Sequence, residues 1–348
     1  LKMDRVPNSA SISTTVEIAK QTNLRGLSGT VNAILRNAIN KLKKKELPIK
    51  PKNDLERIAF YNSIPFWLVK EMIDWFGVQD AENIAKAFNK KPSIDLRINS
   101  LNNNTENFLK ILKQNNIDAK PIKNLVNGIE LITKPRSIKN LPCYEDGGWV
   151  VQDRSSQWVA PLLNPKEGER ILDLCSAPGS KTTHIAELIK DDGEIWAIDR
   201  SEIRLKILRS NLNRLNIKSV KVLKADATKL LDKKPEFEHY FDKVLIDAPC
   251  SGIGTFSRNP DARWFLNQAK IEELVLLQEK LLENSFKFLR NNGAIVYSTC
   301  TICPRENNLL IRKFLKYNPG IKLKSERQIL PSLETYGDGF YAAILTHK

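Results

Sequence analysis

The stretch RILDLCSAPGSKTTHIAELIKDDGEIWAID, residues 170–199, decides the fold. It begins with a short apolar pattern typical of a buried strand, passes through a turn into a helical pattern, and ends in a second strand pattern. Alternating strands and helices are typical of an α/β fold, in which helices cover both faces of a mainly parallel sheet. The rhythm continues, predicting strands at 170–175, 194–199, 220–225, 243–247, 293–298, 321–324 and 340–345, and helices at 181–190, 200–216, 268–290 and 304–316. We therefore predict an α/β domain over residues 152–348.

Residues 1–90 are predicted to form a helical domain. Apolar side chains recur at helical spacing over 29–39, and a capped helix with an aromatic face is expected at 63–76, followed by another at 81–88. We expect the aromatic side chains to belong to a hydrophobic core rather than to a base-stacking surface. A basic, Pro-spaced connector at 48–52 joins the first two helical stretches.

A different pattern occupies residues 93–151. Alternation at 94–99 and 128–132 predicts strands, and the stretch between them contains a short amphipathic helix at 105–115. This predicts a small α+β subdomain. Its basic, Asn-rich surface suits contacts with RNA, although a structural linker explains the composition almost as well.

Net charge and hydropathy indicate which kinds of molecule this protein can bind. The 348 residues carry a net charge of +15 at pH 7, which favours a polyanion such as nucleic acid, although a generally Lys-rich surface is an alternative. No apolar run approaches the roughly 20 residues of a membrane helix, and no signal pattern opens the chain, so we expect a cytoplasmic protein without a membrane partner. The chain begins at Leu1, and residues upstream of it are expected to be missing.

The five cysteines are an odd number spread over a long chain, which favours reduced thiols over a disulfide framework. Cys300 and Cys303 form a C-x-x-C pair that a redox or zinc site would also use. A zinc site needs further ligands, and the three histidines, His184, His239 and His347, show no spacing that supplies them. We therefore expect no bound metal.

The segment Asp247-Ala-Pro-Cys250-Ser-Gly252, at the end of the strand predicted at 243–247, contains both an acid and a thiol that could take part in a reaction. Open α/β sheets bind ligands at the carboxyl ends of their strands, so an acid and a thiol are delivered there together. The next strand ends in Ser298-Thr-Cys300, which would place a second thiol in the same pocket. The alternative is a plain turn in which Cys250 is a small buried hydrophobe.

The turn after the first strand, Asp173 to Thr182, leads into a helix and lets a ligand approach the backbone closely. It has only one glycine and matches neither G-x-G-x-x-G nor the P-loop, which disfavours a phosphate site and favours a nucleoside-type ligand. Asp199 ends the second strand, 26 residues after Asp173 (199 − 173), where such folds place a carboxylate that binds ribose hydroxyls. Asp226 could accept from an adenine amino group, but each acid alone is more often a cap or turn residue.

These motifs together resemble one family, the S-adenosylmethionine-dependent RNA cytosine-5 methyltransferases, and within it the bacterial enzymes that act on 16S ribosomal RNA. The resemblance rests on Asp173 to Lys181, Asp199, Asp226, Asp247 to Gly252, Asn259 to Trp264, Ser298 to Cys300, Pro304 to Asn307 and Asp338 to Tyr341. Residues 29–37 resemble the end of the NusB-like helical domain of those enzymes, although that domain looks short at its N-terminus. Ser180 stands where the family usually has a second glycine.

The resemblance implies a class I, Rossmann-like methyltransferase core and a division of labour between two thiols. Cys300 would add to carbon 6 of the cytosine, which activates carbon 5, and Cys250 would assist release of the product. Asp247 would bind the N3 and amino edge of the base, and Lys181 is our candidate for the positive charge that activates the nucleophile. The implied cofactor-binding residues are Cys175, Ser176, Ala177, Pro178, Gly179, Ser180, Lys181, Asp199, Arg204, Asp226 and Asp247.

DNA cytosine-5 methyltransferases use the thiol of the Pro-Cys motif itself and generally lack the second one, so the presence of both Cys250 and Cys300 favours RNA. We expect a monomer that uses S-adenosyl-L-methionine and acts on 16S rRNA. A tRNA cytosine-5 methyltransferase is the closest alternative, and the helical N-terminal domain favours the ribosomal substrate. A non-catalytic RNA-binding or antitermination-like protein is the alternative from another class.

Overall fold

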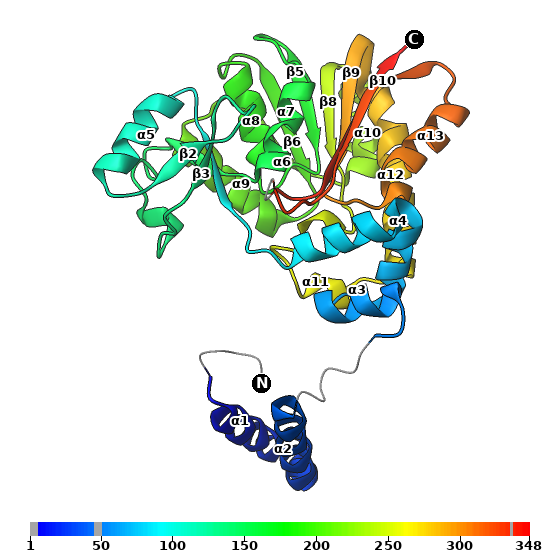
Figure 1. The fold of residues 1–348 in the computed structure, drawn as a ribbon. Coiled ribbons are helices and arrows are strands. Elements are labelled where there is room, and N and C mark those ends of the chain that lie inside the picture. Colours follow the sequence, from blue (N-terminus) through cyan, green and yellow to red (C-terminus); the bar gives the residue numbers. More distant parts are fainter. Residues whose placement is uncertain (1–5, 45–50, 335–336) are drawn as a thin grey trace. The chain divides into compact units, whose positions relative to one another are not determined.

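The structure is a computed structural model that describes residues 6–44, 51–334 and 337–348 (Figure 1). The chain divides into two compact units, Leu1–Phe66 and Trp67–Lys348. The first unit is helical, and the second contains two sheets with their helices. The predicted domain boundaries near residues 90 and 151 do not coincide with this division and stay predictions. The basic connector predicted at 48–52 lies mostly outside the described residues.

The N-terminal unit contains α1 (Asn8–Gln21), α2 (Ser28–Lys43) and α3 (Asp54–Asn62), with a 3₁₀ turn at Arg25–Leu27. Helix α2 confirms the helix predicted at 29–39. Helix α3 begins with reciprocal caps, because the Asn53 side chain accepts from the Glu56 N–H and the Glu56 carboxylate accepts from the Lys52 N–H. It ends at Ser63, whose backbone is left-handed with φ 52°.

Helix α4 (Phe66–Phe88) is two helical segments separated at Gly77, whose φ of 80° and ψ of 167° are not helical. The break confirms the two helices predicted at 63–76 and 81–88. The expectation that the aromatic face is core is wrong for Phe66, which is 56% exposed. Trp67, Trp75 and Phe76 are only half-buried. The buried stripe consists instead of the aliphatic residues Leu68, Val69 and Met72.

The small subdomain is a four-stranded antiparallel sheet in the order β2-β3-β1-β4, with one helix. Its strands β1 (Ile94–Ile98) and β3 (Gly128–Leu131) and its helix α5 (Thr105–Gln114) confirm the predicted elements. The short strands β2 (Ala119–Pro121) and β4 (Trp149–Val151) were not predicted, because three residues are too few for a period to show. Helix α5 packs Phe108 and Leu112 against Leu96, Ile98 and Trp149.

The large sheet has seven strands in the order β10-β11-β9-β8-β5-β6-β7. Strands β5 to β9 run parallel, β11 pairs antiparallel with β9, and the edge strand β10 pairs antiparallel with β11, so the sheet is mixed. Its strands are β5 (Arg170–Leu174), β6 (Glu194–Asp199), β7 (Val220–Lys224), β8 (Phe241–Asp247), β9 (Leu289–Thr299), β10 (Ile321–Ile329) and β11 (Phe340–His347). The longer helices are α8 (Ser180–Leu188), α9 (Glu202–Leu215), α12 (Gln268–Phe288) and α13 (Asn308–Tyr317). Shorter helical turns are α6 (Arg154–Gln157), α7 (Val159–Leu162), α10 (Leu230–Lys233), α11 (Ala262–Phe265) and the 3₁₀ turn η6 (Pro304–Glu306).

Helices cover both faces of this sheet, as predicted (Figure 1). Successive strand side chains point to opposite faces, so Val244 and Ile246 pack against α12 and α13 while Leu245 packs against α7, α8 and α9. Because both faces are buried, the parallel strands are almost continuously apolar. Asp199 and Asp247 end the strands β6 and β8, and the candidate site lies at these carboxyl ends.

Candidate active site

The two thiols predicted to work together lie in contact. Strands β8 and β9 are parallel neighbours, and Asp247 is in register with Ser298 at their carboxyl ends. The chain then continues into Cys250 on one side and Cys300 on the other, and their Sγ atoms are 3.4 Å apart. Residues 50 positions apart thus share one site because their strands pair.

Cys250 is held as a neutral thiol. The hydrogen bond to Cys300, together with burial, raises the pKa of Cys250 well above its usual range. The negative charge of Glu306 acts in the same direction, and a backbone bond from Gly252 opposes it. A thiol that keeps its proton can donate a hydrogen bond to a neighbouring sulfur.

Asp247 and Lys181 form an ion pair beside the thiols. The Lys181 Nζ is 2.8 Å from Asp247 Oδ2, and Ser298 Oγ donates to Asp247 Oδ1 at 3.0 Å. The Lys181 ammonium also lies 4.9 Å from the centre of the Phe340 ring. We expected Lys181 to activate the nucleophilic thiol, and the structure shows its charge paired with Asp247. Lys181 occupies the second position of α8 and is largely buried.

The turn between β5 and α8 is built from two unusual backbone conformations. Cys175 is left-handed with φ 64°, and Gly179 caps α8 with φ 102°. A Cβ at Gly179 would lie 2.2 Å from Leu208 Cδ1, so this glycine allows the turn to pack against α9. Ser180 starts the helix, and the turn therefore does not need the family's second glycine at that position.

A pocket opens at the carboxyl ends of β5, β6 and β7. It contains about 560 Å³ of empty space, open solvent included. Among the predicted cofactor residues, Cys175, Asp199, Arg204 and Asp226 line it. The other predicted residues, Ser176 to Lys181 and Asp247, are not among its walls. The walls that sequence reasoning missed are Arg200, Ala225, Ala227, Thr228, Pro249, Leu277 and Leu281.

The two acids of this pocket differ in their surroundings. The Asp199 carboxylate accepts from the backbone N–H of Ser201 at 2.8 Å and of Ala177 at 3.3 Å, and Arg204 lies 3.5 Å away. Asp226 accepts from both the backbone N–H and the hydroxyl of Thr228, and this bonding lowers its pKa. Asp226 is therefore also the turn cap that was its alternative interpretation. A carboxylate beside Leu277 and Leu281 gives the pocket a polar end and an apolar wall, which suits a nucleoside.

The C-x-x-C alternative receives no support from the geometry. Cys300 contacts Cys250, whereas Cys303 is fully buried, and burial raises the pKa of Cys303 to about 12. Within residues 6–44, 51–334 and 337–348, no group of three or more His, Cys, Asp or Glu side chains is arranged to hold a metal ion.

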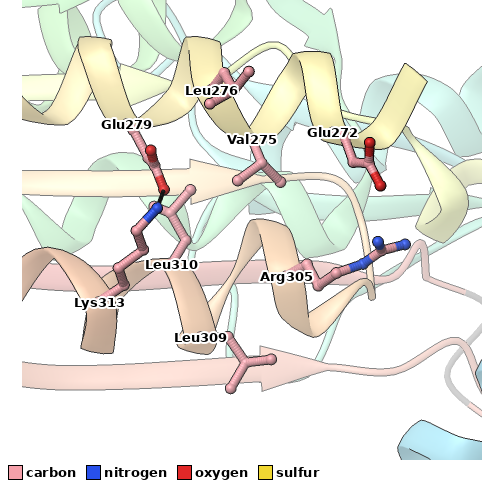
Figure 2. A pocket seen from close by; sticks show the side chains of 8 residues that line it. All are labelled: Glu272, Val275, Leu276, Glu279, Arg305, Leu309, Leu310 and Lys313. Atoms are coloured by element: carbon pink, nitrogen blue, oxygen red, sulfur yellow. Dashed lines mark hydrogen bonds and ion pairs between the residues drawn. The ribbon is translucent and has the colours of Figure 1, made fainter. Parts of the chain in front are cut away.

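Figure 2 shows a second pocket, between α12 and α13. Its apolar lining residues are Val275, Leu276, Leu309 and Leu310, and an ion pair between Lys313 and Glu279 joins the two helices. It shares no residue with the pocket that contains Asp199. The helix α12 thus presents Leu277 and Leu281 to one pocket and Val275 and Leu276 to the other. None of the helices in the described part of the chain is long and apolar enough to cross a membrane.

Comparisons with known families agree over three stretches of the chain. A family model described as 16S rRNA methyltransferase RsmB/F matches residues 160–348. A model of the RsmF/B-like ferredoxin-like domain matches residues 64–139, and a model of the NusB family matches residues 1–40.

Individual proteins are also similar to this chain in sequence and structure. A curated relative from Synechocystis, named "Probable ribosomal RNA small subunit methyltransferase B", is 40% identical over 316 residues, which are 90% of this chain and 70% of the relative. The solved structure of PH0851 superposes with a TM-score of 0.84 at 30% identity, covering 99% of this chain and 79% of that one. A methyltransferase homologue from Pyrococcus horikoshii superposes with a TM-score of 0.75 at 27% identity, covering 86% of this chain and 100% of that one.

Proposed function

This chain belongs to the 16S rRNA methyltransferase RsmB/F family, and on that premise we propose that it methylates carbon 5 of a cytosine in 16S ribosomal RNA. S-adenosylmethionine is the cofactor, and it supplies an electrophilic methyl group. The pocket fits this molecule, because Asp199 can accept from ribose hydroxyls and the apolar side chains of Leu277 and Leu281 can cover an adenine ring.

The observation that carries the proposal is the contact between the two sulfurs, 3.4 Å apart, beside the Lys181–Asp247 ion pair. Carbon 5 of cytosine is a poor nucleophile, and addition of the Cys300 thiolate to carbon 6 makes it enamine-like. Asp247 accepts a hydrogen bond from the amino edge of the base and holds it for the attack. The target base must first leave its stack, which costs a few kcal/mol unless it already lies in a loop.

After methyl transfer, solvent water accepts the carbon 5 proton, the electrons of that C–H bond form the C5–C6 double bond, and Cys300 leaves carbon 6 as a thiolate, which restores the aromatic ring. Cys250 is the residue proposed to assist this step. Because its pKa is raised, Cys250 keeps its proton and can donate a hydrogen bond to the departing sulfur of Cys300. The attack is assigned to Cys300 by the family resemblance, and a thiol that keeps its proton, as Cys250 does, is a poor nucleophile.

Two substitutions test this assignment with labelled S-adenosylmethionine and 16S RNA. We expect Cys300→Ala to abolish both methyl transfer and any covalent RNA adduct. We expect Cys250→Ala to permit the attack but not the release, so that the protein stays on its RNA as a species resistant to denaturant on a gel. Cys143→Ala, a third cysteine in the small subdomain, is the control and should behave like the wild type.

Several results would contradict the proposal. An adduct formed by Cys300→Ala would reverse the roles of the two thiols. Methyl transfer to tRNA in preference to 16S RNA would show the other substrate class, and no transfer to any RNA would show a binding protein. Bisulfite sequencing of ribosomal and transfer RNA from cells that lack the protein would identify the modified position.

A further inference from the structure

A buried carboxylate lies behind the two thiols and outside the chemistry assigned above. Glu306 is fully buried in the 3₁₀ turn η6. Its Oε1 accepts from the Ser251 N–H at 2.8 Å and from Gln278 Nε2 at 3.0 Å, and its Oε2 accepts from the Ser251 hydroxyl at 2.5 Å. Ser251 directly follows Cys250, so Glu306 fixes the loop that carries this thiol.

The next residue, Asn307, holds the other cysteine loop. Its Oδ1 accepts from the Thr299 hydroxyl at 2.6 Å, and its Nδ2 donates to the Thr301 carbonyl at 3.0 Å. Thr299 and Thr301 are the two neighbours of Cys300 in the chain. Asn307 is itself fully buried, so solvent does not compete for these bonds.

The two loops are also joined directly. The hydroxyls of Ser251 and Thr301, each one residue after a cysteine, lie 2.7 Å apart. The helix α12 completes the arrangement, because Gln278 donates to the Pro249 carbonyl at 2.8 Å as well as to Glu306. Apart from the bond between Gln278 and Glu306, each of these contacts is to a residue adjacent to Cys250 or Cys300, and none is to a sulfur.

We propose that Glu306 and Asn307 are positioning residues, which hold the two cysteine loops at the separation that lets Cys250 act on Cys300. This inference rests on the roles proposed above for the two thiols. The reason for a carboxylate at 306 is its acceptor capacity, since its two oxygens receive three donors and offer none. Burial raises the pKa of Glu306, and the bonds from Ser251 oppose that rise.

The test variant is Glu306→Gln, which keeps the shape but turns one acceptor into an NH₂ donor facing other donors. The matched control is Glu279→Gln on α12, whose carboxylate pairs with Lys313 at the edge of the second pocket. We expect Glu306→Gln to lower kcat roughly 10- to 100-fold, because small misplacements of reacting groups have effects of this size. The KM for RNA and the Kd for S-adenosylmethionine should change less than about twofold, which a general loss of structure would not allow.

A second measurement reads the thiol spacing without RNA. Phenylarsine oxide binds two adjacent thiols, with loss of water, and should bind the wild type much more tightly than Cys250→Ala, which sets the baseline. We expect Glu306→Gln and Asn307→Ala to approach that baseline, and Glu279→Gln to match the wild type. Thermal unfolding of each variant shows that it is folded.

The outcomes separate this inference from the proposed function. Suppose that the wild type transfers no methyl group but Glu306→Gln still binds phenylarsine oxide more weakly than Glu279→Gln does. The positioning role then stands, and the proposed methylation reaction is wrong. If the wild type is active and a folded Glu306→Gln keeps both kcat and arsenical binding, the positioning role is wrong. A folded Glu306→Gln that loses S-adenosylmethionine affinity as much as kcat has only a structural role, and this too overturns the inference.

Discussion

Arg97 of β1 and Glu187 of α8 form an ion pair, 2.8 Å between Nη2 and Oε1, in which both side chains are closed off from solvent. Arg97 also donates to the Ser180 carbonyl at 2.7 Å and to the Thr183 hydroxyl at 2.9 Å. One side chain of the small sheet therefore holds the first turn and the middle of the helix that carries Lys181. Arg97 therefore joins the two sheets of the second unit through α8.

Removal of one partner of this pair is expected to be costly. Arg97→Met should lower the free energy of unfolding by about 3–5 kcal/mol, because it leaves the Glu187 carboxylate buried and uncompensated. Urea unfolding measures the change. The double variant Arg97→Met, Glu187→Leu should recover a large part of the loss. Lys190→Ala breaks an exposed pair with Glu167 and should have a far smaller effect. If the double variant were no more stable than Glu187→Leu alone, this account would be contradicted.

Asp199→Asn should weaken the binding of S-adenosylmethionine about 10- to 100-fold, since a hydrogen bond to a charged group contributes about 1.5–3 kcal/mol. Titration calorimetry measures the Kd directly. Asp191→Asn is the control, because Asp191 caps backbone N–H groups of Lys218 and Ser219 and is not a wall of the Asp199 pocket. Equal losses of affinity in the two variants would show that Asp199 acts through folding alone.

Gly254→Ala should disturb the Cys300 loop. The Gly254 N–H donates to the Cys300 carbonyl at 3.1 Å, and a Cβ there would lie 2.2 Å from the Gly339 carbonyl oxygen and 2.8 Å from that of Cys300. We expect a loss of about 1–3 kcal/mol of stability from overpacking, together with a loss of turnover. Gly320→Ala meets nothing within 4 Å and provides the comparison. Unchanged turnover in Gly254→Ala would mean that the backbone contact does not shape the site.

Asp173 should make stability depend on pH. Burial raises its pKa from 3.8 to about 7, although the hydrogen bond from the Thr182 hydroxyl, 2.6 Å away, opposes the rise. Between about pH 4 and pH 7 the folded chain therefore holds a proton that the unfolded chain has lost, so this group's contribution to stability falls as the pH rises.

Asp173→Asn does not titrate and isolates this effect. The stability of the wild type minus that of Asp173→Asn should decrease between pH 4 and pH 7 and level off above it. Urea unfolding at a series of pH values measures the difference. A difference that grew with pH would show that the folded state favours the charged carboxylate.

The sequence patterns predicted the large sheet well, because strands buried on both faces are apolar and stand out from the amphipathic helices between them. They also placed Asp199, Asp247, Cys250 and Cys300 at strand ends, where parallel pairing brings them to one edge. Leu277 and Leu281, which line the pocket that contains Asp199, were not predicted, since leucines four residues apart on a helix have the spacing of ordinary core residues.

Charged residues with buried roles were harder to find. Arg97 lies in an alternating strand, where a charged position normally faces water, and only the packing of α8 on that face explains its burial. Glu306 lies two residues after Pro304 in a short turn, and the Pro304 to Asn307 motif has no periodicity that predicts its burial. The burial of such side chains depends on which distant elements pack against them, and the local sequence does not specify those elements. The aromatic face of α4 shows the opposite case. Phe66 is a large apolar residue, which predicts burial, but its side chain is exposed.

The register of β8 against β9, with Asp247 opposite Ser298, has a consequence for folding. A parallel pair needs a long crossover, and here that connection contains α12. A chain in which the two strands are still apart has two separated thiols. Cys250 and Cys300 therefore come into contact only once β8 and β9 have paired, and arsenical binding followed during refolding should appear with the native sheet and not before it.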